Sequence, residues 1–408
     1  MQFTMPFNAL LASVLLTMSI GDVLAVPTSH QPGSWPAALQ ARNTTEAYDS
    51  YRSKIFRGLA RRAAAPFSTP ITTVANDAAF HVQAIIGKNT RPFLLHLDSA
   101  TPDFWVYSAT CPQRGAHNGV TAAAPNTFRA SSAVVLDVSY QDGDKAEGAG
   151  GIDTVQFAGQ RAATPAIQFG VADQVTGQFP RLAEDGVLGM GPPSFDDPPF
   201  NPNDKEEHLN PPFMQNLLAS RVIPALVSGW KLPRSKDAGS VGSLAFGAPD
   251  PAHFVAPLAT VRSAPLSARN KKPWGVPITA ATLDTTALLV KPIFGFVDFG
   301  TTDISMSPTE ADVINSRIAG AKRVSAGKWN IPCNTQAKLT LTIAGKAWPI
   351  DPRDLAFAPV AGAAGLCQSN IVGEEKVAGQ WILGGTFLKN VYTVLDQGRT
   401  QVSFATPK

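Results

Sequence analysis

The sequence predicts a chain of many short β-strands arranged as two similar half-domains. Its 408 residues include 33 Gly and 34 Pro spread along the chain, which is typical of turns between short strands and not of long helical bundles. Hydrophobic residues make up 44% and charged residues 16%, so a large core is available and a disordered chain is excluded. An internal repeat with a long period indicates the two halves.

Each copy of the repeat contains an apolar run that ends in Asp, and a later apolar segment that ends in Gly. The first copy reads FLLHLD at residues 93–98 and GVLG at residues 186–189; the second reads IFGFVD at residues 293–298 and WILGG at residues 381–385. A carboxylate at the end of a buried strand must find hydrogen bonds or stay protonated. If the halves pack about a pseudo-twofold axis, Asp98 and Asp298 meet, share one proton and act as an acid and a base.

The N-terminal region has the features of segments that are removed from the working protein. Residues 1–25 hold an apolar run and small residues before residue 26, which predicts a secretory signal. Residues 26–62 are predicted to be a basic propeptide, although an ordinary solvated linker is the alternative. The basic residues of this segment, opposed by only two acidic ones, are Arg42, Arg52, Lys54, Arg57, Arg61 and Arg62. Because the rest of the chain is then neutral, we expect an electrostatic latch on an acidic cleft, released by low pH or by cleavage after Arg62.

Charge and cysteine content exclude several classes of function. The formal net charge of +3 comes without a long basic run, so no nucleic-acid partner is expected. Three cysteines and six histidines without paired spacing do not predict a metal site. Cys333 and Cys367 are close enough in sequence to close a loop, and Cys111 is interpreted as a small buried hydrophobe, with a reactive thiol or an intermolecular bridge as alternatives. We expect no membrane span in the mature chain.

Taken in order along residues 75–408, these motifs resemble those of the pepsin-like aspartic peptidases, in particular the fungal secreted endopeptidases. The repeated Asp motifs are followed by Trp105 in the first copy, by a flap-like hairpin sequence at residues 138–144, and by GGTFL at residues 384–388. The resemblance implies an all-β, bilobal fold with two related lobes about a pseudo-twofold axis and the active cleft between them. We expect an N-terminal lobe at residues 63–255 and a C-terminal lobe at residues 256–408, with a Cys333–Cys367 disulfide.

The resemblance also implies the chemistry. Asp98 and Asp298 would hold a water that attacks a peptide carbonyl, one Asp taking its proton and the other donating to the carbonyl oxygen, with no cofactor, metal or covalent intermediate. Tyr140 would close over the substrate, supported by Trp105. The remaining residues expected to contact substrate are Asp142, Gly300, Thr301 and Thr302, and those expected to support the Asp pair are Ser99 and Thr101.

The two Asp motifs depart from the family pattern. Ala100 stands where the family has Gly, and its methyl is expected to crowd the catalytic water, or to strain a turn that needs a positive φ. Phe299 stands where the family has Thr or Ser, so one of two hydroxyls that reach the opposite turn is missing, at a cost of about 0.5 to 1.5 kcal/mol. Gln141 replaces the usual flap Gly and is expected to stiffen the hairpin.

These departures leave three hypotheses open. The main prediction is an acid endopeptidase, made as a zymogen, that acts on peptides or proteins. The alternatives are a homologue that binds or inhibits without cutting, and a repurposed acid/base enzyme that acts on a small molecule, since fold does not fix function. We expect a monomer that is secreted, with the vacuole or the cell wall as other destinations.

Overall fold

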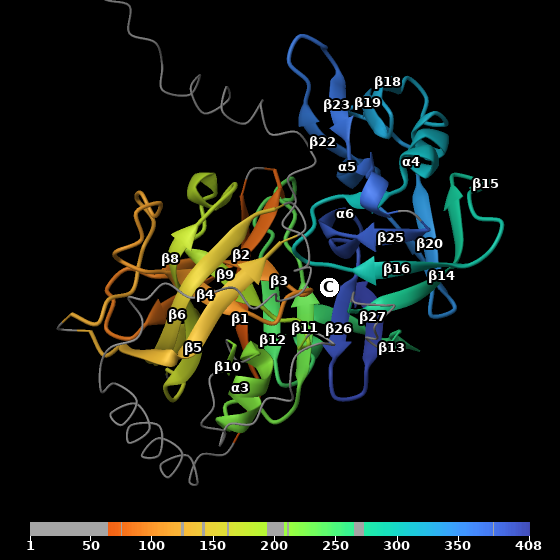
Figure 1. Ribbon diagram of the computed structural model, residues 1–408. Coiled ribbons are helices and arrows are strands. Elements are labelled where there is room, and N and C mark those ends of the chain that lie inside the picture. Colours follow the sequence, from red (N-terminus) through yellow and green to blue (C-terminus); the bar gives the residue numbers. More distant parts are fainter. Residues whose placement is uncertain are drawn as a thin grey trace, which may run out of the picture.

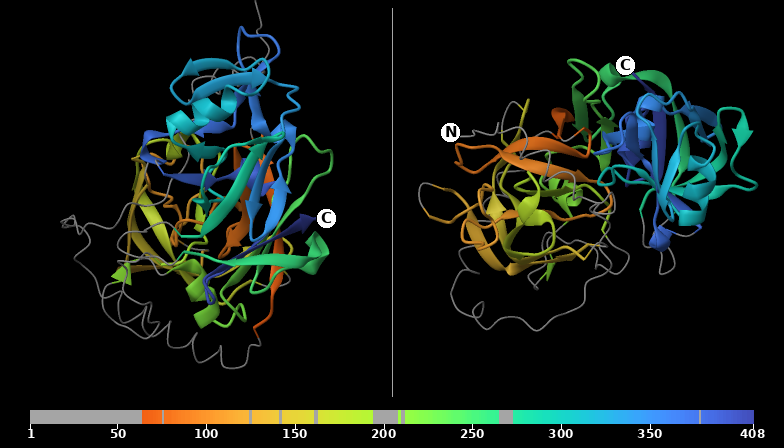
Figure 2. Two further views of the ribbon diagram at one scale, coloured as in Figure 1. Left: turned by 90° about the vertical axis from the view of Figure 1, so that its right-hand side faces the viewer. Right: turned by 90° about the horizontal axis from the view of Figure 1, so that it is seen from above.

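The structure is a computed structural model that describes residues 64–408, except residues 75, 124–125, 141–142, 161–162, 194–207, 210–211, 265–272 and 378. The predicted signal segment and propeptide lie outside the described residues and stay predictions. Figure 1 shows two β-rich lobes, one built from the first half of the chain (orange to yellow-green) and the other from the second (cyan to blue). Figure 2 shows the same division from two other sides. The predicted all-β, bilobal class is therefore confirmed.

A 15-stranded sheet forms the N-terminal lobe and continues under the C-terminal lobe. Its order is β10-β5-β6-β8-β4-β9-β3-β2-β1-β12-β11-β26-β27-β13, with β7 paired to β2. The strands of the N-terminal lobe are β1 (Phe67–Val74), β2 (Ala79–Ile86), β3 (Phe93–Asp98), β4 (Phe104–Tyr107), β5 (Arg129–Ser139), β6 (Lys145–Asp153), β7 (Val155–Phe157), β8 (Ile167–Val175), β9 (Gly186–Gly189) and β10 (His208–Leu209). The strands that continue the sheet are β11 (Val227–Lys231), β12 (Gly242–Phe246), β13 (Phe254–Arg262), β26 (Tyr392–Asp396) and β27 (Gln401–Pro407).

Two smaller sheets form the C-terminal lobe. The eight-stranded sheet has the order β21-β20-β14-β16-β25-β17-β24 with β15 on β14, and the four-stranded sheet has the order β18-β19-β23-β22. The first contains β14 (Gly275–Leu283), β15 (Thr286–Ala287), β16 (Ile293–Val297), β17 (Ile304–Met306), β20 (Leu339–Ile343), β21 (Lys346–Pro349), β24 (Ile371–Gly373) and β25 (Gln380–Leu383). The second contains β18 (Lys322–Ser325), β19 (Lys328–Pro332), β22 (Ala356–Pro359) and β23 (Leu366–Ser369).

The helices of the described ranges are short. They are α3 (Phe213–Ala219), α4 (Pro308–Asn315), α5 (Pro352–Leu355) and α6 (Gly385–Leu388), with 3₁₀ turns η2 (Phe179–Arg181), η3 (Pro251–His253) and η4 (Glu375–Val377). Helix α4 begins at a capping box, in which Ser307 accepts from the Glu310 N–H and the Glu310 side chain reaches back to the cap. Cys333 and Cys367 form the predicted disulfide. Cys111 is free and buried, as its interpretation as a hydrophobe expects.

The two copies of the sequence repeat form the same crossing of strands. In the first copy β9 runs parallel to β3 and antiparallel to β4; in the second β25 runs parallel to β16 and antiparallel to β17. A Cβ at Gly189 would lie 2.4 Å from the Asp103 carbonyl oxygen, and a Cβ at Gly384 would lie 2.4 Å from that of Asp303. Only glycine allows such an approach, which explains why both returning segments end in Gly.

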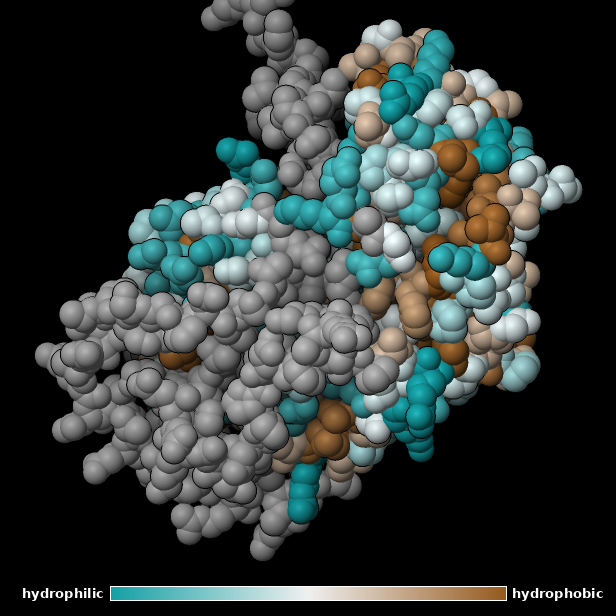
Figure 3. Space-filling view, turned by 45° about the vertical axis from the view of Figure 1, so that its right-hand side comes forward, coloured by the Kyte–Doolittle hydropathy of each residue, from teal (hydrophilic) through white to brown (hydrophobic). Residues whose placement is uncertain are grey.

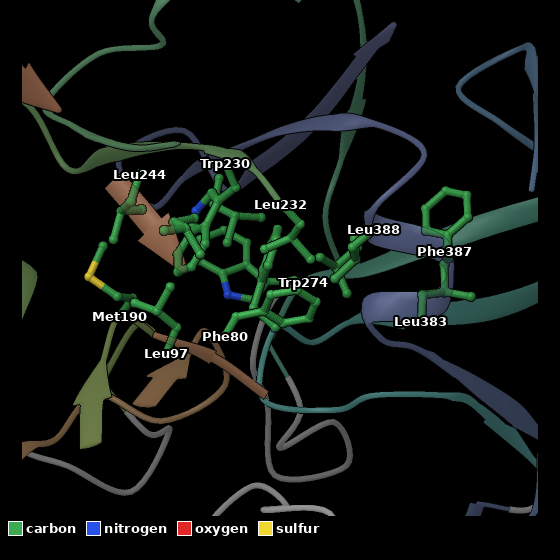
Figure 4. Packing of buried hydrophobic residues seen from close by; sticks show 14 of the residues in the cluster. Phe80, Leu97, Met190, Trp230, Leu232, Leu244, Trp274, Leu383, Phe387 and Leu388 are labelled. Atoms are coloured by element: carbon green, nitrogen blue, oxygen red, sulfur yellow. The ribbon is translucent and has the colours of Figure 1, made fainter. Parts of the chain in front are cut away.

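One continuous core joins the lobes. It includes Phe80 and Leu97 from the first half of the chain together with Trp274, Leu383 and Leu388 from the second. Figure 4 shows Phe80, Trp230 and Trp274 close together between the elements of the two halves. Because these side chains are almost completely buried, the two lobes hold each other in a defined relative position.

The surface mixes hydrophilic and hydrophobic groups. Figure 3 shows scattered brown groups among teal ones on the described part of the face that it presents. Within the described ranges, no helix combines the length and the apolar character that a membrane crossing needs. The predicted lobe boundary between residues 255 and 256 falls inside β13 and stays a prediction.

Candidate active site

Asp98 ends the buried strand β3 and is 1% exposed. The strand forms here because the apolar run at residues 93–97 packs into the core on both faces, so the carboxyl is delivered into the interior. Its Oδ1 accepts hydrogen bonds from the N–H groups of Ala100 (2.7 Å) and Thr101 (3.3 Å). Its Oδ2 has no hydrogen-bond partner in the described part of the protein. Burial raises the pKa of Asp98, although the Ala100 N–H and nearby His96 oppose the shift.

Asp298 follows β16 and is 4% exposed. Its Oδ1 accepts from the Gly300 N–H at 2.9 Å, and its Oδ2 accepts from the Thr301 hydroxyl at 2.9 Å. Donors on both oxygens favour the ionised carboxylate. The Asp298 N–H in turn donates to the Leu383 carbonyl of β25, which fixes the turn to the crossing strands.

The two carboxyl groups meet at Gly300. A Cβ built on Gly300 would lie 3.2 Å from Asp98 Cγ and 3.3 Å from both Asp98 Oδ1 and Asp298 Oδ1. One methyl-sized volume therefore touches both carboxyl groups. Both carboxyl groups therefore line the same small buried volume, where two neighbouring carboxyls favour a shared proton over two charges.

A hydrogen bond joins the two Asp turns, and the second turn also packs on a tryptophan of β11. The Phe299 N–H donates to Ser99 Oγ at 3.0 Å, as expected for the hydroxyl that remains. Phe299 itself stacks on Trp230, with ring centroids 4.1 Å apart and planes 21° apart, and is 1% exposed. The space that the aromatic ring needs is therefore supplied by the core beside Trp230, while the Phe299 N–H still reaches Ser99.

Ala100 is accommodated without backbone strain. It does not have a left-handed conformation, so the turn does not require glycine for that reason. Its N–H still donates to Asp98 Oδ1, so the methyl does not disturb the hydrogen bonding of this carboxyl.

Comparison with known proteins agrees with this geometry. The family model described as eukaryotic aspartyl protease matches residues 79–407. The chain belongs to this family. The match covers both Asp turns and the strands that cross behind them, so the resemblance inferred from the motifs is confirmed.

Several curated fungal proteins are similar to this aspartyl protease family member. A probable aspartic-type endopeptidase CTSD of Arthroderma benhamiae is 29% identical over 347 residues, which are 84% of this chain and 64% of the relative. Rhizopuspepsin of Rhizopus chinensis is 26% identical over 94% of this chain and 92% of the relative. Vacuolar protease A of Aspergillus fumigatus is 27% identical over 81% of this chain and 80% of the relative. The chain thus spans just under two thirds of the first of these relatives.

The flap-like sequence lies on a pair of antiparallel strands. Strands β5 and β6 pair antiparallel up to Ser139 and Lys145, and the Tyr140 N–H donates to the Asp144 carbonyl at 2.8 Å. Trp105 Nε1 donates to the Tyr140 hydroxyl at 3.0 Å, and the Tyr140 ring packs against Phe179. The structure therefore brings Tyr140 and Trp105 together. Asp142 and Gln141 lie outside the described residues.

Two threonines make contacts that differ from the expected ones. The Thr101 hydroxyl, expected to bond the Asp98 carboxyl, has no hydrogen-bond partner among the described residues, whereas the backbone N–H of Thr101 donates to Asp98 Oδ1. Thr302, expected at the substrate, donates its hydroxyl to the Ala78 carbonyl at 2.6 Å. Thr302 therefore links the second Asp turn to the N-terminal lobe.

Two tryptophans beside the Asp turns were not anticipated from the sequence. Trp274 Nε1 donates to the Ser99 carbonyl at 2.8 Å, and Trp230 supports Phe299 by stacking. Both belong to elements far from the Asp motifs in sequence, so no local pattern marks them.

A buried polar cluster around strand β3 was also not anticipated. It consists of His81, His96 and Glu184, all at most 6% exposed. Burial opposes ionisation of Glu184, but the hydrogen bond from His81 and the proximity of His96 hold the pKa of this carboxyl well below its ordinary value. The only signal in the sequence was a His inside each of two apolar strands.

Proposed function

We propose that this protein is an aspartic endopeptidase that hydrolyses peptide bonds with Asp98 and Asp298 as an acid and base pair. The observation that carries the proposal is that two buried carboxyls, each at the end of an equivalent strand, touch a common volume at Gly300. Membership of the aspartyl protease family and similarity to proteins named as aspartic endopeptidases support it.

The environments of the two carboxyls suggest how the roles divide. Asp98 has one oxygen without a partner among the described residues and a pKa raised by burial, so it holds the shared proton and donates it to the carbonyl oxygen of the substrate. Asp298 receives donors on both oxygens, so it is ionised and takes a proton from the attacking water. After attack, the proton gained by Asp298 passes to the amine as the C–N bond breaks, and a hydroxyl of the tetrahedral intermediate returns a proton to Asp98, which restores the pair.

The surrounding residues position the substrate and the pair. Tyr140, held by Trp105, closes over the substrate, and the backbone around Gly300 and Thr301 contacts the substrate main chain. Asp142 completes the flap in this proposal. Ser99 keeps the two turns in register through the Phe299 N–H.

Activity is proposed to require acid, because the pair works only with one proton present. The protein is proposed to be a monomer, made with a basic propeptide at residues 26–62 and directed into the secretory route by residues 1–25. Its substrates are proposed to be unfolded peptides and proteins. The proposed destination of the protein is the medium, with the vacuole and the cell wall as the other destinations of the secretory route.

The test is cleavage of an unfolded protein by the purified chain, freed of its propeptide, across the acid to neutral range, with and without pepstatin. Cleavage in acid that pepstatin abolishes supports the proposal. A folded chain that binds pepstatin or peptides without cutting them is a binding homologue instead. A folded chain that neither binds nor cuts peptides overturns the proposal and favours a repurposed enzyme.

A further inference from the structure

The cluster of His81, His96 and Glu184 is assembled from three separate segments. His81 on β2 lies opposite His96 on β3 in the antiparallel register, and Glu184 stands just before β9, which pairs with the other edge of β3. Glu184 Oε1 is 2.6 Å from His81 Nε2 and 3.5 Å from His96 Nδ1. One ligand atom from each residue lies within 4.8 Å of the others.

The protein leaves most of this cluster without hydrogen bonds. The described residues offer no partner to His81 Nδ1, to either ring nitrogen of His96 or to Glu184 Oε2. His81 is 0% exposed, His96 4% and Glu184 6%. Polar atoms buried this deeply are nearly always paired, because an unpaired one loses its hydration without compensation. The single His81–Glu184 hydrogen bond therefore does not account for a polar cluster inside an apolar lobe.

We propose that His81, His96 and Glu184 bind a divalent late transition-metal ion, with Zn²⁺ as the probe. Two imidazole nitrogens and one carboxylate oxygen are a common protein ligand set for Zn²⁺, which adds a fourth ligand of its own. Bonds of about 2.0 to 2.2 Å place neighbouring ligand atoms roughly 3.3 to 3.5 Å apart. The 3.5 Å spacing between Glu184 and His96 already fits, and the 2.6 Å spacing to His81 opens by less than about 1 Å. Mg²⁺ and Ca²⁺ are disfavoured because they prefer oxygen ligands.

A metal here would join three segments behind the catalytic strand. His96 is separated from Asp98 by one residue of β3, and Glu184 precedes the strand that crosses behind the Asp98 turn. The metal would therefore be structural, since its ligands are buried and none of them belongs to the Asp pair. It would neutralise the Glu184 carboxylate and fix β2, β3 and β9 to one another.

The test measures metal binding by the full chain with Asp298→Asn, which prevents self-digestion. The protein is stripped of metal, dialysed against ZnCl₂ near neutral pH, and its zinc content and affinity are measured by mass spectrometry and calorimetry. The expected result is one Zn²⁺ per chain, a higher melting temperature with Zn²⁺ than with a chelator, and no effect of Mg²⁺. Glu184→Gln and His96→Gln should each weaken binding by more than the roughly 10- to 100-fold that loss of an outer partner costs.

His253→Gln is the matched control. His253 also faces a carboxylate, with Nε2 3.7 Å from Asp250 Oδ2, but it lies outside the cluster and is only half-buried. Binding should survive this substitution. The proposal is overturned if the unsubstituted chain binds no zinc, or if zinc binds equally well to the cluster variants and the control.

Co²⁺ absorption tests the metal site in the unsubstituted chain, so the test does not depend on whether the variants fold. Co²⁺ bound to the unsubstituted chain should give the intense visible absorption of a four-coordinate site, and Zn²⁺ should displace it. Weak absorption typical of six-coordinate Co²⁺, or none, contradicts the proposed site. Neither result depends on peptidase activity, so failure of the proposed function and failure of the metal site are distinguishable.

Discussion

Replacing Ser99 with Ala removes the hydrogen bond that Phe299 N–H donates across the two Asp turns, 3.0 Å long and fully buried. Because Phe299 carries no hydroxyl, it supplies no bond of its own in the opposite direction. A buried N–H left without its acceptor costs about 1 to 3 kcal/mol, so the free energy of unfolding should fall by that amount. The turns should also lose their register, which lowers kcat more than it raises KM because the carboxyls and not the substrate pockets move.

The assay combines urea unfolding at neutral pH with kcat and KM for a peptide substrate in acid. Thr69→Val is the matched control, because Thr69 is 1% exposed and its buried hydroxyl has no hydrogen-bond partner in the described structure. Its loss should leave both stability and activity nearly unchanged. If Ser99→Ala behaves like Thr69→Val, the bond between the two turns does not position the Asp pair and the reasoning is refuted.

Three further predictions concern pH, the flap and the disulfide. Burial raises the pKa of Asp303 to about 7 from 3.8, so between these pH values the folded protein holds a proton that the unfolded chain loses. The free energy of unfolding should therefore fall by roughly 4 kcal/mol as the pH rises from about 4 to about 7. Asp303→Asn should flatten this dependence in urea titrations. Trp105→Phe removes the donor to the Tyr140 hydroxyl and should lower kcat/KM by about 2- to 10-fold with a small loss of stability; unchanged kinetics would exclude a role for this bond in closure. Replacing Cys333 and Cys367 together by Ser opens a loop of 34 residues and should lower the free energy of unfolding by roughly 3 to 4 kcal/mol, with an unchanged urea midpoint as the contradicting result.

The repeated parts of the fold were predictable because short stretches of sequence mark each of them. Asp98 and Asp298 each end an apolar run, and a glycine stands at the end of each returning strand, Gly189 as the last residue of β9 and Gly384 directly after β25. The sequence therefore shows both the carboxyls and the close crossings. The disulfide followed from resemblance to the family, and the structure forms it.

The parts that were not predictable depend on contacts between distant segments. Nothing near Phe299 in sequence indicates that Trp230 offers a stacking surface, so the ring could be expected only to crowd the turn. Likewise His81, His96 and Glu184 have no metal-ligand spacing along the chain, and they meet only because β2 pairs with β3 and β9 crosses beside them. Strand pairing, and not local sequence, brings the three residues of this cluster together.

The most direct test of the account is a comparison of Asp98→Asn, Asp298→Asn and the double variant in cleavage of an unfolded protein in acid. If the two carboxyls act as one unit, each single substitution should reduce kcat to nearly the residual level of the double variant, since residues of one machinery are strongly non-additive. All three variants should keep the near-ultraviolet circular dichroism of the unsubstituted protein. Retention of substantial activity by either single variant, or losses that simply add in the double variant, would contradict a shared acid and base pair.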